Sequence, residues 1–272
     1  MRGFSPSDAA LEGFQVLRQH WRVVVGWAGF AFVAVIAMVV VTVIVAVPMQ
    51  LLAGGPESND AVTVASIIWP LGMIGVMALT VSALFRLMLR SEQPEFLYLR
   101  IGADELRILA VLLALGLCKV LILWAGAGLV AVAAKGGMAV TILIGVILIL
   151  SFFALAARFG LAPVMTFADR RLRLAAAWRL GRGHTVQLAG MALLAFCLVA
   201  FMAGASWVGL FLLGGVLTGF QDLSLSGVAS LEAHPGRVLF QVVTEMMLIP
   251  VFLVLLLAPW VAAYRALSAD PA

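Results

Sequence analysis

The sequence predicts an all-α fold, a polytopic membrane helical bundle of six transmembrane helices in a single integral membrane domain over residues 1–272. Apolar residues make up 64% of the chain and charged residues 11%, whereas soluble proteins are about half apolar and a quarter charged. Six nearly uncharged runs each reach the roughly 20 residues that cross a bilayer. Backbone groups inside lipid must satisfy their own hydrogen bonds, so such runs form helices. The composition therefore excludes a soluble domain, a disordered chain and a disulfide scaffold.

The first half of the chain contains four predicted spans. The first covers residues 23–47 and ends before Pro48, and the second covers residues 61–85 and ends at Arg86. The third and fourth spans, residues 108–134 and 138–157, are separated by Lys135-Gly136-Gly137. Glycine pairs favour turns, so this short segment predicts a tight connection between two antiparallel helices.

The second half contains two further spans, residues 186–210 and 238–264. Residues 185–221 carry no charge, which is more than one crossing needs and barely enough for two. We interpret this segment as one span followed by an interfacial or tilted extension through Gly214-Gly215. Two crossings would instead give seven spans and place the C-terminus on the other face.

The distribution of basic residues predicts the orientation. With six spans, fourteen of the seventeen Lys and Arg residues fall on one side of the membrane. Cytoplasmic segments near membrane ends are enriched in such residues, so both termini are expected in the cytoplasm. The net charge of +4 is therefore interpreted as topology, and no nucleic-acid partner is expected. The first 22 residues are too long and polar for a cleaved signal, so they should be retained.

A charged, partly amphipathic segment precedes each outward-running span. Ser5-Pro6-Ser7-Asp8 predicts a helix start, with Ser5 as the N-cap and Pro6 at the first helical position. An apolar stripe follows that should lie on the inner leaflet: Leu11, Phe14, Leu17 and Trp21.

The segment before the fifth span resembles this N-terminal segment. Aligning Phe14 with Trp178 also aligns Arg18 with Arg182 and His20 with His184. Residues 94–107 precede the third span in the same way. We therefore hypothesise three repeated helical hairpins, each preceded by a cytoplasmic interfacial helix.

Two charged residues lie inside predicted spans, Lys119 and Glu245. Counted from opposite membrane faces at about 1.5 Å per residue, they fall roughly 17 Å and 11 Å deep, at nearly the same level. Burying such charges is costly, which makes them a candidate intramembrane pair. They could belong to a proton or substrate path, could fix helix register as a structural pair, or could lie near the interfaces without touching.

The densest basic segment of the chain lies between the fourth and fifth spans. Each basic residue near an anionic leaflet adds about 1 kcal/mol of attraction. Five of its arginines are candidate contacts for anionic lipids: Arg170, Arg171, Arg173, Arg179 and Arg182.

The same segment carries a resemblance to a known family. The run from Asp169 to Gly183, with Trp178 and the Arg182-Gly183 pair before a span, resembles the glycerophosphoryl diester phosphodiesterase membrane-domain family. The ending Tyr264-Arg265-Ala266-Leu267 is also similar. Ala177 stands where the family usually has a serine. The resemblance implies a multi-helix domain of the bacterial inner membrane, sometimes fused to a catalytic domain for which this chain has no remaining length.

Motifs that would indicate an enzyme are missing from the sequence. His20, His184 and His234 are far apart, so neither a metal site nor a cofactor is expected. Ser206 lacks a nucleophile motif and, with Ala205 and Gly209, is interpreted as a packing face. We therefore expect a non-enzymatic protein of membrane organisation, lipid interaction or assembly, with membrane lipids, a membrane protein or a second copy as partners. The alternative is a small transporter or channel that uses the level of Lys119 and Glu245.

Overall fold

The computed structural model describes residues 5–52, 60–90, 96–133, 137–218 and 235–268, and this part of the chain is helical without strands. Six of its helices are long and apolar enough to cross a membrane, which confirms the predicted fold class and helix count. They are α1 (Pro6–Leu52), α2 (Asp60–Leu89), α3 (Ala103–Ala133), α4 (Met138–Phe159), α7 (Thr185–Thr218) and α9 (Pro235–Ser268). The shorter elements are the 3₁₀ turn η1 (Phe96–Tyr98), α5 (Ala162–Asp169) and α6 (Leu174–Gly183).

The long uncharged segment forms a single helix. α7 continues from Thr185 through Gly214 and Gly215 to Thr218 without a break, so two crossings within these residues are excluded. Residues 219–221 lie outside the described part. At the turn between α3 and α4, Lys135 and Gly136 also lie outside it. Gly137 has φ +100°, a conformation that glycine adopts readily, so the glycine is needed where α4 begins.

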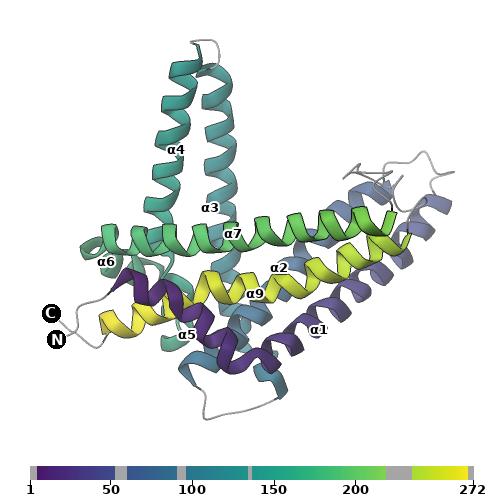
Figure 1. The fold of residues 1–272 in the computed structure, drawn as a ribbon, viewed down its shortest axis with the longest axis horizontal. Helices are drawn as coiled ribbons and strands as arrows, with labels where there is room; N and C mark the ends of the chain where they lie inside the picture. The colour runs from purple at the N-terminus through teal and green to yellow at the C-terminus, as the bar shows by residue number, and fades with distance from the viewer. Residues whose placement is uncertain (1–4, 53–59, 91–95, 134–136, 219–234, 269–272) are drawn as a thin grey trace.

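The helices α1, α2, α7 and α9 lie alongside one another, whereas α3 and α4 leave this group (Figure 1). α9 packs against α1 and α7, and α1 also packs against α2. The beginning of α1 and the end of α9 lie at the same end of this group, as an even number of crossings requires (Figure 1). The hairpin of α3 and α4 projects steeply away from the group, and its base contacts α2, α5, α6 and α7.

The main core lies at the end of the bundle where the basic residues gather. Trp27, Phe85, Ile108 and Phe167 are almost completely buried there, and they come from α1, α2, α3 and α5. A smaller cluster lies after Trp27 on α1 and before Phe85 on α2. It contains Ala31, Val35, Met38 and Val76. The arginine-rich end is therefore the tightly packed part of the described chain.

The N-terminal segment is a helix, as predicted, but it packs on α9 through a face of small residues. The amide of Asp8 donates to Ser5 Oγ at 3.4 Å, so the predicted cap is present. A Cβ atom added at Gly13 would lie 2.9 Å from Leu255 Cα, so the two backbones are in close contact. Leu11 and Trp21 of the predicted apolar stripe are 48% and 57% exposed. Phe14 and Leu17 of the same stripe are half-buried, and Leu17 packs against the main core, so only part of the stripe is available to a membrane.

The backbone supports two of the three repeated units. α1 is interrupted at His20 (φ −121°, ψ 29°), and α6 ends before α7 at His184 (φ −123°, ψ 23°). The residues aligned from the sequence thus form the same break between a short helix and a long one. The second unit differs, because the short turn η1 precedes α3 in the described residues where an interfacial helix was predicted.

Candidate functional site

The five candidate arginines form one exposed surface, which we call the arginine surface: Arg170, Arg171, Arg173, Arg179 and Arg182. The first residue of the arginine surface, Arg170, directly follows α5. Arg170 adopts a left-handed conformation (φ 54°), which ends α5 and turns the chain toward α6. Arg173 Nε lies 3.1 Å from Asp169 Oδ2, an exposed ion pair that contributes little stability. Five exposed positive charges therefore lie within one short segment, residues 170–182.

The helix α6, which carries Arg179 and Arg182, packs against the end of α4. The Trp178 ring packs 5.1 Å from the Phe159 ring, and the Arg158 guanidinium lies 4.4 Å from the Trp178 ring centroid. A Cβ atom added at Gly181 would lie 3.2 Å from Arg158 Cα. Ala177 is fully buried on the same face. α6 therefore docks one face on α4 and leaves its arginines outside, and Trp178 is partly buried in this contact.

A second polar cluster is buried beside the arginine surface. Arg86 in the last turn of α2 forms an ion pair with Glu105 in the first turn of α3, and their side chains are 8% and 7% exposed. Arg90 Nη2 donates to the backbone oxygen of Phe167 at 3.3 Å, and its guanidinium lies 5.0 Å from that ring. Arg90 Nη1 also lies 3.7 Å from Asp104 Oδ2, within ion-pair distance. These contacts join the ends of α2, α3 and α5.

The same cluster holds a strained connection. Leu97 and Tyr98 in η1 have φ angles of 53° and 57°, a conformation that costs roughly 1–2 kcal/mol per non-glycine residue. The Trp27 indole donates to the Leu97 oxygen at 2.7 Å, and Arg86 Nη1 donates to the Tyr98 oxygen at 2.5 Å. Side chains from α1 and α2 therefore stabilise the unusual backbone.

The sequence reasoning missed this buried cluster. Arg86 was counted only among the basic residues that predict the orientation, and no buried role was predicted for Glu105. An available signal was the pair of acidic residues, Asp104 and Glu105, at the start of a span directly after a segment rich in arginine. Trp27 is one apolar residue among many in its span. No sequence pattern indicates that its indole donates a hydrogen bond to a turn seventy residues away.

The structure gives Lys119 and Glu245 separate surroundings and does not join them as an ion pair. Lys119 is exposed on α3, with Nζ 5.8 Å from the Phe152 ring centroid on α4. Glu245 is partly buried on α9 and lines a cavity against α7. The shared level inferred from helix lengths assumed parallel spans, whereas the hairpin that carries Lys119 leaves the other helices (Figure 1).

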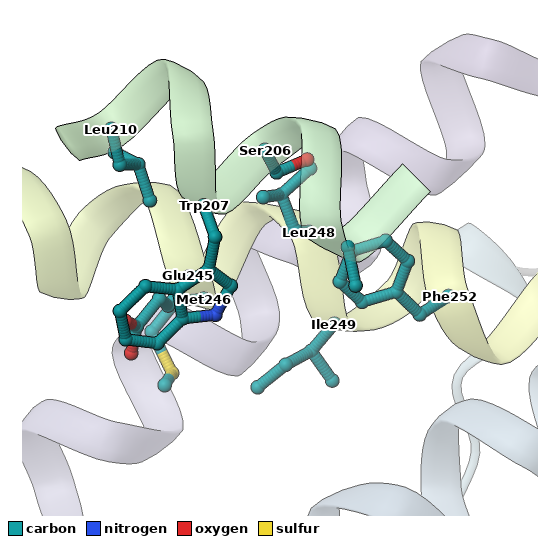
Figure 2. Close-up of a pocket in the computed structure, with 9 residues that line it drawn as sticks. Ser206, Trp207, Leu210, Glu245, Met246, Leu248, Ile249 and Phe252 are labelled. Atoms are coloured by element: carbon teal, nitrogen blue, oxygen red, sulfur yellow. The ribbon is translucent and has the colours of Figure 1, made fainter. Parts of the chain in front are cut away.

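The cavity between α7 and α9 has a volume of about 220 Å³. Figure 2 shows the Trp207 side chain extending from α7 toward α9, with Glu245 and Met246 below it and Phe252 farther along α9. Ser206 Oγ donates to the Met202 oxygen at 2.8 Å, so its proton is used within α7. Ser206 faces the cavity, but Ala205 and Gly209 are exposed. Within the described chain, Ala205 and Gly209 of the predicted small-residue face therefore do not serve as a close packing surface for another helix.

No grouping of three metal-ligating side chains occurs among the described residues, which include His20 and His184 but not His234. The chain matches no protein-family model, no curated protein and no solved structure. The resemblance to the glycerophosphoryl diester phosphodiesterase membrane-domain family therefore stays a prediction. What the structure establishes is a multi-helix protein with the helices of a membrane bundle.

Proposed function

We propose that this chain is a non-enzymatic, multi-pass protein of the bacterial inner membrane that binds anionic lipid headgroups at its arginine surface. The observation that carries this proposal is the docking of α6 on α4, which holds Arg179 and Arg182 outside a packed base. Guanidinium groups bind phosphate oxygens through paired hydrogen bonds, and a fixed cluster of them retains anionic lipids against neutral ones. Both termini lie on the cytoplasmic side in this proposal, as the basic residues predict.

Two features support a binding role over catalysis or transport. Ser206 donates its proton to its own helix, which is typical of a structural serine and not of an activated nucleophile. The transporter alternative was based on a shared Lys119 and Glu245 site, and these residues have separate surroundings. The arginine surface thus offers the better-supported function, in lipid interaction and the organisation of membrane partners.

Binding of a fluorescent short-chain phosphatidylglycerol to the full chain in neutral micelles tests the proposal. We expect Arg179→Gln/Arg182→Gln to weaken binding by about thirtyfold, from roughly 1 kcal/mol for each charge. The effect should shrink as salt is raised, because exposed charges are screened. The matched control is Arg18→Gln/Arg22→Gln, which removes two exposed charges from α1. Equal losses in both variants would show that net charge, and not the arginine surface, determines binding.

A further inference from the structure

Lys119 is a charged side chain near the middle of α3 that the rest of the described chain leaves uncovered. α3 is a candidate membrane span from Ala103 to Ala133, and Lys119 is one residue from its midpoint. Centring α3 on a hydrocarbon core of roughly 30 Å places this residue about 15 Å from either interface. That depth exceeds the reach of the four-methylene stem of a lysine. Because the side chain is exposed, its charge faces hydrocarbon unless another molecule covers it.

Within the described residues, an aromatic ring is the one partner of the Lys119 ammonium group. Its Nζ lies 5.8 Å from the ring centroid of Phe152 on α4. Such contacts extend to about 6 Å and are weaker for phenylalanine than for tryptophan. The ring does not replace the oxygen acceptors that three N–H donors require. Charged side chains within spans usually pair with an opposite charge, because an unpaired charge in lipid is costly. Lys119 therefore calls for an acidic partner from outside the described chain.

The side of α3 next to Lys119 is open to a neighbouring helix. Four residues spaced three or four apart form one stripe along the helix: Gly116, Val120, Leu123 and Ala127. Val120 is 49% exposed and Leu123 is 63% exposed. A Cβ atom added at Gly116 would meet nothing within 4 Å in the described chain, and a glycine lets another helix backbone approach closely in lipid. A second helix can thus pack on this stripe with a side chain directed at Lys119.

A second copy of the chain fits this stripe poorly. Two copies meeting symmetrically there would bring two Lys119 charges together. The other charge inside the predicted spans, Glu245, already interacts within its own chain. The acidic residues in the first turn of α3, Asp104 and Glu105, already form ion pairs with arginines. Charge complementarity therefore favours a different protein as the source of the carboxylate.

We infer that the stripe beside Lys119 docks a transmembrane helix of a different protein, one that carries an Asp or Glu near the middle of its span. The carboxylate of that helix pairs with the Lys119 ammonium group, and its apolar side chains cover Val120 and Leu123. The hairpin of α3 and α4 then serves as the arm that reaches the partner (Figure 1). The inference does not involve the arginine surface, so it is independent of the anionic-lipid proposal.

Synthetic transmembrane peptides of leucine and alanine with one central Glu, Gln or Lys test this inference. Their retention by the immobilised full chain in neutral dodecyl maltoside micelles gives each affinity. We expect wild-type protein to bind the Glu peptide about tenfold more tightly than the Gln peptide, the gain typical of one charge-assisted hydrogen bond. Lys119→Leu should bind the Glu and Gln peptides equally, and Lys119→Glu should prefer the Lys peptide.

Two controls separate this stripe from general effects of charge and bulk. Arg18→Gln removes an exposed positive charge outside the hairpin and should keep the wild-type preference. Gly116→Leu should weaken binding of the Glu peptide severalfold, because the added side chain holds the helices apart. Gly128→Leu is its matched control, since a Cβ atom there also meets nothing within 4 Å. Gly128 lies nine residues, or two and a half turns, from Lys119 and therefore on the opposite side of α3.

Equal affinity of wild-type protein for the Glu and Gln peptides would overturn the inference, and so would an unchanged preference in Lys119→Leu. If Lys119→Leu fails to fold, the comparison of the two peptides on wild-type protein decides alone. Dimers of the wild-type chain that Lys119→Leu abolishes would overturn the choice of a different protein, because the partner would then be a second copy. Displacement of the Glu peptide by added phosphatidylglycerol would overturn it in favour of an anionic lipid.

Discussion

The buried ion pair between Arg86 and Glu105 makes a quantitative prediction about stability. Replacing Glu105 with Gln leaves the Arg86 charge in a site where its side chain is 8% exposed. Removing one partner of a buried ion pair costs about 3–5 kcal/mol, since the remaining charge has lost both water and its counter-ion. We expect this loss in the free energy of unfolding of Glu105→Gln. Arg86→Met should cost at least as much, because the Tyr98 oxygen also loses its donor.

The double variant Arg86→Met/Glu105→Met separates the pair from its surroundings. It buries no unpaired charge, so it should be destabilised by less than the sum of the two single methionine variants. Unfolding by sodium dodecyl sulfate in mixed micelles, followed by helical circular dichroism, measures each free energy. The control is Arg107 with Asp104, whose nitrogen and oxygen lie 2.6 Å apart but whose side chains are 36% and 20% exposed.

We expect Arg107→Gln to cost less than about 1 kcal/mol, as partly exposed pairs do. The reasoning would be refuted if Glu105→Gln cost no more than Arg107→Gln. It would also be refuted if the methionine substitutions at Arg86 and Glu105 were strictly additive, because the two charges would then not interact.

Three further substitutions test the packing. Gly13→Leu should lower the thermal midpoint by several degrees, because its side chain would push α1 away from the Leu255 backbone; a midpoint equal to that of wild type would argue against this contact. Trp27→Phe should cost about 1–3 kcal/mol, since the Leu97 oxygen loses its donor, and denaturant titration measures the loss. Ser82→Ala should leave stability unchanged or raise it slightly, because the Ser82 hydroxyl is buried without a hydrogen-bond partner in the described chain; a loss above about 1 kcal/mol in the same titration would indicate a missed partner.

The helices were predictable because lipid imposes a minimum length on each apolar run. Hydropathy placed all six spans, and the positions of Ser5 and Pro6 correctly marked the start of α1. The alignment of His20 with His184 located two matching helix breaks. These features depend on residues close in sequence, so the sequence alone contains their cause.

Contacts between helices were less predictable. The predicted pairing of Lys119 with Glu245 assumed that all spans share one axis. In the structure the α3–α4 hairpin leaves the other helices, and Lys119 lies beside Phe152 within this hairpin. The bond from Trp27 to Leu97 joins residues seventy positions apart, and no local pattern encodes it. The arginine surface was predicted as a group, because its members are neighbours along one short segment, but the docking of α6 on α4 depends on Gly181 and Trp178.

The projection of the α3–α4 hairpin has a consequence for the bilayer. In the most hydrophobic stretch of 18 residues of each of these two spans, 11% and 0% of the residues are buried against the rest of the protein. Protein packing therefore fixes the base of the hairpin, while the acyl chains determine the tilt of the remainder. Thinner or thicker bilayers should change the angle of this hairpin and leave the packed core near Trp27 and Phe85 undisturbed. Bilayer thickness would thus set the shape of this protein at one hairpin.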